Sequence, residues 1–519
     1  MSAYQEGSHH CMNAPHEDAL TTLEEVTIRQ LQDAMSEGRV TARQLVERYL
    51  ERIERIDRAG PAINSVIEIN PDCLDNADAL DEERTTRGAR GPLHGIPILI
   101  KDNIATDDRM QTTAGSLALL GSRPPRDAFV ARKLREAGAV ILGKTNLSEW
   151  ANFRARASSS GWSGRGGQTR NPYVLDRSPC GSSSGSGSAI AANLAAAALG
   201  TETDGSILCP SSMNGLVGIK PTLGLTSRAG VVPIAHSQDT VGPMTRTVAD
   251  AALLLGAITG IDERDPATRT SEGRFHTDYT KFLEKDGLRG ARIGVVREVY
   301  FGYSAKADAI AEAAIKQMRE LGAEIIDPAN IPDAKKLAES PNELTVLLYE
   351  FKADLNAYLA DLLESPVRSL ADIIAFNLAH ADQELRYFGQ EHMLRAQEKG
   401  GLDEADYLSA LQENQQLARA GIDEVMNQHQ LDALVMPTTG PAWCIDLVNG
   451  DHESGGSSQP GAVSGYPAIT VPAGESFELP VGITFLGRAY SEPTLLRLAY
   501  AFEQATQARR APRYLPSVP

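Results

Sequence analysis

The stretch that decides the fold of this chain is residues 178–189, SPCGSSSGSGSA, where serine and glycine fill every position between Cys180 and Ala189. An isolated run of this composition is typical of a flexible linker. Here it continues into residues 188–200, SAIAANLAAAALG, which predict a helix ended by Gly200. A serine- and glycine-rich run is not a free linker when it is joined directly to such a helix. Its glycines also allow backbone segments to approach closely. We therefore expect an ordered loop here.

The rest of the chain has the pattern of an α/β protein. It has 519 residues, of which 42% are apolar and 23% charged, and these values are ordinary for a globular protein. Short apolar runs alternate with helical patterns, which predicts a largely covered sheet. The predicted buried strands are residues 97–100, 139–142, 292–296, 433–437, 468–472 and 481–485.

The pattern along the chain predicts one large domain between two tails. Residues 1–20 are polar and predict a disordered N-terminal tail, and residues 511–519 predict a loose C-terminal tail. Residues 21–510 form the single domain in this interpretation. Within it, residues 305–430 are helical and polar in pattern and predict a mostly helical lobe over the sheet.

Charge and cysteine content restrict the partners and the compartment. The net charge is −18, and no basic stripe offers phosphate contacts, so a nucleic-acid partner is not expected. The five cysteines form no CxxC pair and no metal-ligand pattern, which argues against a disulfide framework and for a reducing compartment. The N-terminus lacks the apolar run of a signal peptide, and residues 189–200 are too short to span a bilayer. We therefore expect a cytoplasmic protein without a membrane partner, metal or cofactor.

Two familiar motifs match the sequence but not their required context. Residues 138–145, GAVILGKT, match the phosphate-binding loop, yet the four central residues predict a buried strand rather than a loop. Residues 181–185, GSSSG, match a nucleophile elbow centred on Ser183, but no strand precedes them. His94 lies beside a predicted strand, where a single histidine is more often a structural hydrogen-bonding group.

Two further segments carry chemistry. In residues 94–104, HGIPILIKDNI, Lys101 ends a run of apolar residues, and burial would lower its pKa until it can act as a base near neutrality. The alternative is an ordinary lysine at the end of a strand, paired with Asp102. In residues 200–210, GTETDGSILCP, successive amides at 203–206 can form a nest that holds an oxyanion.

Taken in order, these segments resemble the amidase signature family. The matching motifs are HGIPILIKDN at 94–103, GKTNLSEWA at 143–151, SPCGSSSGS at 178–186, GTETDGSI at 200–207 and the glycine-rich 215–230. The resemblance covers residues 22 to 510, and residues 160–173 are most similar to bacterial peptide amidases. It implies a mixed β-sheet core covered by helices on both faces, and hence an amidase signature domain over residues 21–510.

The resemblance also implies a role for each matching residue. Ser206 would be the nucleophile, Ser182 a bridging serine commonly held at a cis peptide, and Lys101 the base, neutral in the resting enzyme. Ser183 would support the loop by hydrogen bonding. The oxyanion hole would consist of the backbone amides of Thr203, Asp204, Gly205 and Ser206.

Two departures from the family pattern bear on the substrate. Asp204 replaces a glycine of many members, and it can accept a hydrogen bond from a substrate amide. Leu208 replaces an arginine, which argues against members that recognise acids. The resemblance implies hydrolysis of carboxamides through an acyl-enzyme, with C-terminal peptide amides as substrates and ammonia as a product.

The same resemblance leaves other functions open. The alternatives are the glutaminase subunit of a tRNA-dependent amidotransferase, an amidase for small aliphatic or aryl amides, and a non-catalytic binding protein on the same fold. A non-catalytic protein would need to have lost Lys101, Ser182 or Ser206, and all three residues are present. The expected partner is a small-molecule or peptide amide, and the expected state is a monomer or homodimer.

Overall fold

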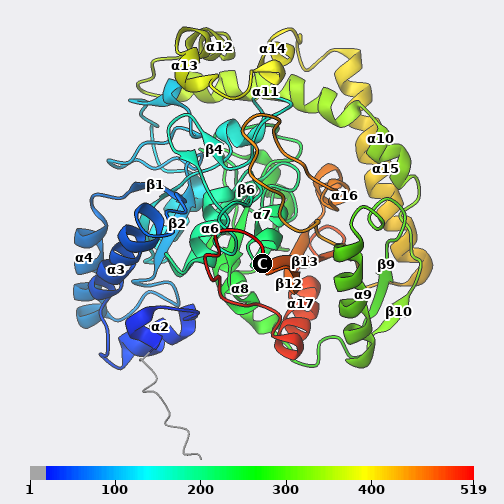
Figure 1. Cartoon of the computed structure of the whole chain (residues 1–519), viewed down its shortest axis with the longest axis horizontal. Helices are drawn as coiled ribbons and strands as arrows, with labels where there is room; N and C mark the ends of the chain where they lie inside the picture. The colour runs from blue at the N-terminus through cyan, green and yellow to red at the C-terminus, as the bar shows by residue number, and fades with distance from the viewer. Residues whose placement is uncertain (1–18) are drawn as a thin grey trace, which may run out of the picture.

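The computed structural model of the chain describes residues 19–519 and is built around one mixed sheet (Figure 1). In spatial order the strands of this sheet are β1 (Val66–Ile69), β3 (Val140–Thr145), β2 (Pro97–Lys101), β6 (Ala197–Glu202), β8 (Thr240–Thr245), β7 (Val217–Lys220), β12 (Ala468–Ser476), β13 (Leu479–Leu486), β11 (Ala433–Pro437), β9 (Arg292–Val295) and β10 (Glu324–Ile326). β2 is parallel to β3 and β6, whereas β12 and β13 form an antiparallel pair. A separate small sheet pairs β4 (Trp162–Ser163) with β5 (Gly167–Gln168).

Helices cover both faces of the sheet. They are α1 (Ala19–Thr22), α2 (Ile28–Ser36), α3 (Ala42–Arg52), α4 (Cys73–Arg87), α5 (Phe129–Glu136), α6 (Ser184–Ala191), α7 (Leu208–Met213), α8 (Val248–Ile258), α9 (Ala305–Glu320), α10 (Ala334–Glu339), α11 (Asn342–Asp361), α12 (Leu370–Ala379), α13 (Ala381–Glu384), α14 (Glu391–Gln397), α15 (Ala405–His429), α16 (Gln459–Ser464) and α17 (Glu492–Thr506). Short 3₁₀ or π turns are η1 (Ile53–Arg58), η2 (Leu117–Leu119), η3 (Glu149–Asn152), η4 (Pro266–Ser271) and η5 (Thr280–Phe282).

Successive side chains of β11 pack into two different cores, one on each face of the sheet. Val435 belongs to the core beneath α9 and α17, where it packs with Phe485 of β13 and Phe502 of α17. Its neighbour Met436 belongs to the opposite core, with Ile422 of α15. Since successive side chains of a strand point to opposite faces, a strand covered on both sides must be apolar throughout. The continuous apolar run at 433–437 therefore follows from burial on two faces.

All six strands predicted from short apolar runs are present, as β2, β3, β9, β11, β12 and β13. The helix predicted over residues 188–200 is wrong in its second half. α6 ends at Ala191, and Ala197–Glu202 form β6, between β2 and β8 in the sheet. Helix propensity differs little between residues, so tertiary context overrides it. The small side chains of this strand suit a position where α6 packs against β6 and β2.

The helices from α9 to α15 fill most of residues 305–429, with β10 among them. Figure 1 shows α11 across the top of the molecule, with α12, α13 and α14 above it and α15 along the right edge. The division of the chain into one domain with a helical lobe stays a prediction.

Of the two predicted tails, only the C-terminal one lies wholly within the described residues. The predicted N-terminal tail lies outside the described residues, except for Ala19 and Leu20 in α1. The C-terminal tail predicted to be loose is instead attached. Tyr514 N donates to Pro172 O at 3.0 Å, and Leu515 N donates to Tyr173 O at 3.1 Å. Apolar side chains of this segment pack on the core, which gives it a reason to be ordered.

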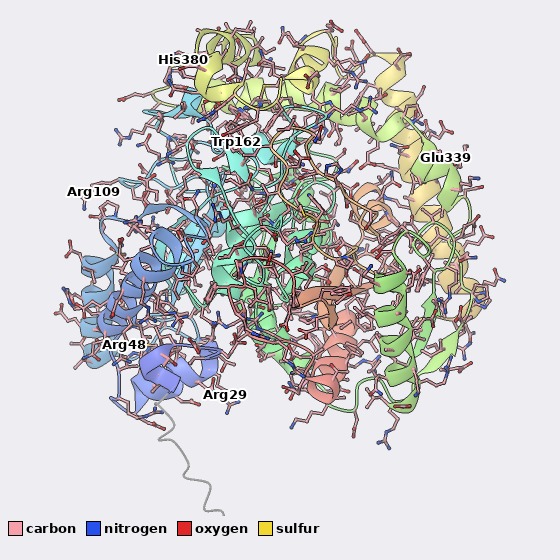
Figure 2. The ribbon with its side chains drawn as sticks, viewed as in Figure 1. Arg29, Arg48, Arg109, Trp162, Glu339 and His380 are labelled. Atoms are coloured by element: carbon pink, nitrogen blue, oxygen red, sulfur yellow. A yellow bond between two sulfur atoms is a disulfide. The ribbon has the colours of Figure 1, made fainter. Side chains whose placement is uncertain are left out.

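Charged side chains such as Arg29, Arg109 and Glu339 lie on the periphery, whereas Trp162 lies inside (Figure 2). No helix among residues 19–519 combines the length and the apolar character that crossing a membrane requires.

Candidate active site

Lys101 is the last residue of β2, and its side chain is completely buried. β2 and β6 run parallel, so their carboxyl ends meet and bring Lys101 beside Thr201. Lys101 Nζ lies 2.7 Å from Ser182 Oγ, 2.8 Å from Thr201 Oγ1 and 3.3 Å from the Thr201 carbonyl oxygen. Burial lowers the pKa of Lys101 to about 7, and the negative charges of Asp239 and Glu202 oppose this shift.

The neighbours of Lys101 show what its neutral amine can do. A neutral amine has two N–H donors and one lone pair. The carbonyl oxygen of Thr201 only accepts, and Thr201 Oγ1 can take the second N–H. The lone pair then faces the Ser182 hydroxyl, whose proton it can accept. Asp102, the alternative partner of Lys101, instead accepts from Gly115 N at 3.1 Å.

Ser182 lies in the serine- and glycine-rich stretch, which is an ordered loop leading into α6. The Ser182 side chain is buried, and the peptide bond between Gly181 and Ser182 is cis. Ser148 N donates to Ser182 O at 3.1 Å, and Ser184 Oγ donates to Cys180 O at 2.6 Å. A Cβ at position 181 would lie 2.1 Å from Ser148 Oγ, so only glycine fits there.

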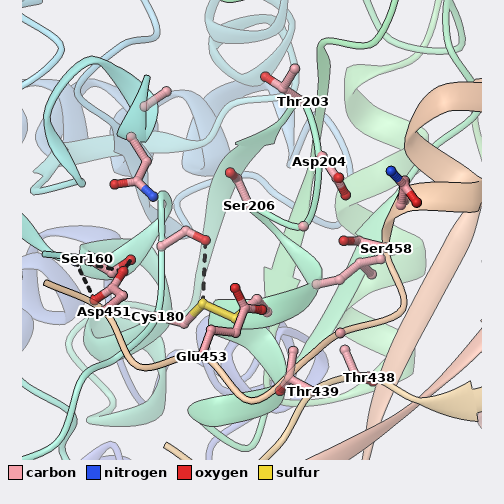
Figure 3. Close-up of a pocket in the computed structure, with 18 of the residues that line it drawn as sticks. Ser160, Cys180, Thr203, Asp204, Ser206, Thr438, Thr439, Asp451, Glu453 and Ser458 are labelled. Atoms are coloured by element: carbon pink, nitrogen blue, oxygen red, sulfur yellow. Dashed lines mark hydrogen bonds between the residues drawn. A yellow bond between two sulfur atoms is a disulfide. The ribbon is translucent and has the colours of Figure 1, made fainter. Parts of the chain in front are cut away.

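Ser206 lies on the turn between β6 and α7, and its side chain faces a cavity (Figure 3). Gly205, just before it, has a φ of +77°, a left-handed conformation that favours glycine. Ser183 N donates to Ser206 O at 3.2 Å, so the two serine segments lie side by side. Within residues 19–519 the Ser206 hydroxyl has no hydrogen-bond partner. It is therefore free to meet a ligand in the cavity.

The turn at residues 203–206 presents its backbone to the same cavity. In the described part of the chain, none of its four amides donates a hydrogen bond. Glu202 fixes the following residues, since its Oε2 accepts Ile207 N at 2.7 Å and Leu208 N at 2.9 Å. Unpaired amides on a fixed turn beside a serine can stabilise an oxyanion.

Ser183, the central residue of the rejected elbow motif, is completely buried. Its Oγ donates to Thr201 O at 3.0 Å and accepts from Thr201 N at 3.2 Å. These two bonds attach the loop to the end of β6.

The cavity has a volume of about 490 Å³ and takes its walls from distant segments. The first wall comes from residues 180–181 and 203–209, and the second from residues 438–459 (Figure 3). The other residues that line it are Ala151, Asn152, Phe153, Ser160, Ile234 and Leu347.

Asp204 faces a second carboxyl, Glu343 of α11, that the sequence did not suggest. Asp204 Oδ1 is buried and has no hydrogen-bond partner among the described residues. Glu343 accepts Gln238 Nε2 at 3.0 Å and Gln459 Nε2 at 2.8 Å. Burial, together with the charge of Asp204, raises the pKa of Glu343 to about 8. At neutral pH Glu343 therefore holds its proton.

Sequence reasoning also missed the acidic residues of the second wall. Asp451 is held firmly, because it accepts Ser160 N at 3.0 Å and Trp443 Nε1 at 3.0 Å. Glu453 is exposed and points into the pocket (Figure 3). Desolvation in the cavity, with Asp204 and Asp451 nearby, raises the pKa of Glu453 to about 7. The one signal in the sequence is the composition of residues 448–461, where acidic residues stand among glycines and serines, as is typical of a loop.

The absence of disulfides expected from cysteine spacing is wrong. Cys180 and Cys209 form a disulfide with a Cα–Cα distance of 6.0 Å, while Cys73 and Cys444 are free. The pairing joins segments 29 residues apart, so spacing gave no sign of it. The bond also removes the argument for a reducing compartment, which was one of the grounds for the cytoplasmic prediction.

One group of side chains in the described residues has the composition of a metal site: His236, Glu350 and Asp354. Their atoms are engaged with each other and with neighbours. His236 Nδ1 lies 2.9 Å from Asp354 Oδ2, and Glu350 accepts Ser237 N at 2.9 Å and Tyr407 Oη at 2.7 Å. The group fastens the loop at residues 236–237 to α11.

Comparisons with known proteins agree with this geometry. The family model described as Amidase matches residues 44–496. A peptide amidase from Stenotrophomonas maltophilia is 52% identical, covers 95% of this chain and 99% of its own, and superposes with a TM-score of 0.90. A peptide amidase in complex with the competitive inhibitor chymostatin is also 52% identical, with a TM-score of 0.91 over 94% of this chain and 99% of its own.

Relatives found by sequence include both an amidase and a subunit of an amidotransferase. A protein of Arabidopsis thaliana named "Probable amidase" is 47% identical over 501 residues, which are 95% of this chain and 92% of the relative. A subunit of the glutamyl-tRNA(Gln) amidotransferase of Moorella thermoacetica is 35% identical over 499 residues, which are 93% of this chain and 97% of the relative. The family match spans most of the chain, and so do these relatives. The chain belongs to the amidase signature family and is an amide-hydrolysing enzyme.

Proposed function

We propose that this enzyme hydrolyses carboxamides through a Ser206–Ser182–Lys101 relay, and that its substrates are the C-terminal amides of peptides. The observation that carries the relay is the buried Lys101, with a pKa lowered to about 7 and Nζ 2.7 Å from Ser182 Oγ. A lysine with its ordinary pKa would be an ammonium at neutral pH and could not accept a proton.

The first half-reaction forms an acyl-enzyme. Ser206 Oγ attacks the carbonyl carbon of the amide, its proton passes to Ser182 Oγ, and the Ser182 proton passes to Lys101 Nζ. The carbonyl oxygen becomes an oxyanion that accepts hydrogen bonds from the amides of residues 203–206. The carbon–nitrogen bond then breaks, the proton returns from Lys101 through Ser182 to the leaving nitrogen, and ammonia departs.

The second half-reaction uses water. A water molecule takes the place of ammonia and attacks the ester carbon on Ser206, and its proton follows the same route to Lys101. When the ester bond breaks, Ser206 recovers its proton and the carboxylic acid leaves. The base is thus neutral again at the end of each cycle.

Peptide amides as substrates are supported by the 52% identity to peptide amidases and by the cavity. A volume of about 490 Å³ accommodates more than a simple aliphatic amide. Asp204 lines the cavity, so its carboxyl group can accept a peptide N–H of the substrate. Leu208, which replaces an arginine of other members, leaves no cation at that position to bind the carboxylate of a substrate such as glutamine.

The test is ammonia release from a panel of C-terminal peptide amides, glutamine, asparagine, acetamide-type amides and aryl amides. Ser206→Ala is the blank, and Ser211→Ala is the matched control, because Ser211 is a buried serine of α7 without a hydrogen-bond partner among the described residues. We expect peptide amides to be hydrolysed fastest and Ser206→Ala to lose activity by about 10⁴-fold or more. Full activity in Ser206→Ala would overturn the relay, and a preference for glutamine would favour the glutaminase of an amidotransferase.

A further inference from the structure

The Cys180–Cys209 disulfide brackets the two serines of the proposed relay. Cys180 lies two residues before Ser182, and Cys209 lies three residues after Ser206. The covalent loop that it closes therefore contains both serines, together with α6 and β6. Both cysteines line the catalytic cavity, and the bond lies below Ser206 in the view of Figure 3.

We propose that this disulfide is a positioning element of the active site, which holds the Ser182 loop against the Ser206 turn, so that the enzyme is fully active only when the bond is intact. This inference rests on the proposed function, because it assigns the bond a part in the Ser206–Ser182–Lys101 relay. Neither sulfur reacts with the substrate.

Apart from the disulfide, the Ser182 loop has more contacts with β2 and β6 than with the Ser206 turn. Ser182 is attached to the β2 and β6 side through Lys101, and Ser183 is attached there through Thr201. Between the Ser182 loop and the Ser206 turn, one backbone hydrogen bond, Ser183 N to Ser206 O, has a length of 3.2 Å. The disulfide is the covalent connection between them. A misplacement of about 1 Å in a reacting group can cost about 100-fold in rate.

Loss of the bond would act at the cavity wall itself. A dithiol such as dithiothreitol transfers two electrons and two protons to the disulfide, leaves two cysteine thiols and becomes a cyclic disulfide. The two sulfurs then make a non-bonded contact and must move apart within a closely packed wall. Both side chains are nearly buried, at 5% exposure for Cys180 and 6% for Cys209, and the cavity is where they meet solvent.

The test compares the wild-type enzyme with the double variant Cys180→Ala/Cys209→Ala, with and without dithiothreitol. The substrate is the amide of the panel that the wild type hydrolyses fastest, and circular dichroism sets an assay temperature at which both proteins are fully folded. We expect dithiothreitol to lower the wild-type kcat by about 10- to 100-fold, to the value of the double variant, with a smaller change in KM. The double variant should not respond to dithiothreitol.

Two control variants retain the bond. Cys444→Ser removes an exposed free thiol, and Cys73→Ala removes a buried one. Both should lose activity in dithiothreitol as the wild type does. Peptide mapping after alkylation should find the Cys180 and Cys209 peptides linked before reduction and separate after it, in step with the loss of activity.

A pH profile separates positioning from general loosening of the fold. Lys101 stays buried if only the serines shift, so the acid limb of kcat/KM should keep its midpoint near the wild-type value in the double variant. A loosened core would admit water to Lys101 and move the limb to higher pH. In Ser206→Ala, which binds without turnover, a saturating peptide amide should slow reduction of the bond, because it fills the cavity.

The inference fails if the folded double variant has the kcat of the wild type, or if reduced and oxidised enzyme have equal activity. It also fails if the acid limb moves upward with the loss of the bond. Failure of the proposed function looks different, since the oxidised wild type would then release no ammonia from any amide of the panel.

Discussion

The two walls of the cavity beside Ser206 differ in how they are held. The first wall, residues 180–181 and 203–209, is fixed by backbone hydrogen bonds, by the buried hydroxyl of the neighbouring Ser183 and by a disulfide. The second wall, residues 438–459 with Glu343 of α11 beside it, contributes carboxyls whose pKa values are raised by burial and by each other. Reacting atoms need fixed geometry, so we expect changes in the first wall to act on kcat. The carboxyls of the second wall would contact the bound substrate, so we expect changes there to act on KM.

Beyond the Ser206→Ala blank, the largest effect is expected for Lys101→Met, which removes the proposed base behind the first wall. We expect kcat/KM to fall by about 10²- to 10⁴-fold, the usual range for a general base. In the wild type, kcat/KM should fall as pH decreases through about 7, because protonation of Lys101 removes its lone pair. Rates of ammonia release between pH 5 and 9 measure both.

Lys144→Met is the matched control for Lys101. Lys144 is also completely buried, and burial lowers its pKa to about 8, but it hydrogen-bonds to Ile104 O and Thr112 Oγ1, away from the cavity. This variant should lose stability but keep the kcat of the folded enzyme. An active Lys101→Met, or an acid limb near pH 4, would contradict the relay.

The next effect concerns Asp239, which positions the first wall. It accepts Thr203 Oγ1 at 2.5 Å and Ile234 N at 2.9 Å, and its charge raises the pKa of Lys101. Asp239→Asn should lower kcat about tenfold, because a shift of the turn at residues 203–206 by less than about 1 Å is enough for such a loss. It should also move the acid limb below that of the wild type, because the pKa of Lys101 falls when the negative charge is removed.

Asp250→Asn serves as the control for Asp239. Asp250 is buried at the start of α8, and burial raises its pKa to about 6, as it does for Asp239. It accepts Ile28 N at 3.0 Å, far along the chain from the cavity. The acid limb should not move in this variant, and an equal shift in both would contradict the local effect.

A smaller effect tests Asp204, at the boundary between the walls. Asp204→Asn should raise KM for peptide amides by about tenfold, the loss expected for one hydrogen bond to a charged group. Acetamide-type substrates, which lack the further peptide N–H, should lose much less. Initial rates give KM for both substrate types. Equal changes in KM would show that Asp204 does not bind the peptide N–H of the substrate.

The smallest effect is expected for Glu453→Gln in the second wall. Glu453 is ionised above pH 7, and Asp204 and Asp451 add negative charge around it. We expect peptide amides with a lysine or arginine side chain to lose about two- to fivefold in kcat/KM above that pH, as for a partly screened ion pair. Neutral peptide amides should be unaffected. Glu298→Gln, an exposed residue outside the cavity, is the control, and equal effects from the two variants would deny Glu453 this role.

Much of the fold follows from local pattern, and its exceptions have physical causes. An apolar run such as residues 433–437 predicts a strand covered on both faces, and β11 is one. Ala197–Glu202 was predicted as part of a helix, because alanine has the highest helix propensity of all residues, whereas its place as a strand between β2 and β8 depends on the rest of the sheet. Likewise, the bonds of Tyr514 and Leu515 to residues 172–173 depend on partners about 340 residues away.

The sequence by itself determined three local features of the proposed site: Lys101 at the end of an apolar strand, the serine- and glycine-rich loop at 178–189, and the turn at 203–206. Their properties come from adjacent residues, whose apolar character buries the lysine and whose glycines shape the turns. Only the tertiary structure decided that Cys180 bonds to Cys209, and that Glu343 and Glu453 approach Asp204. These contacts join segments far apart in the chain, and the packing of a whole sheet with its helices fixes their distance, which no local pattern encodes.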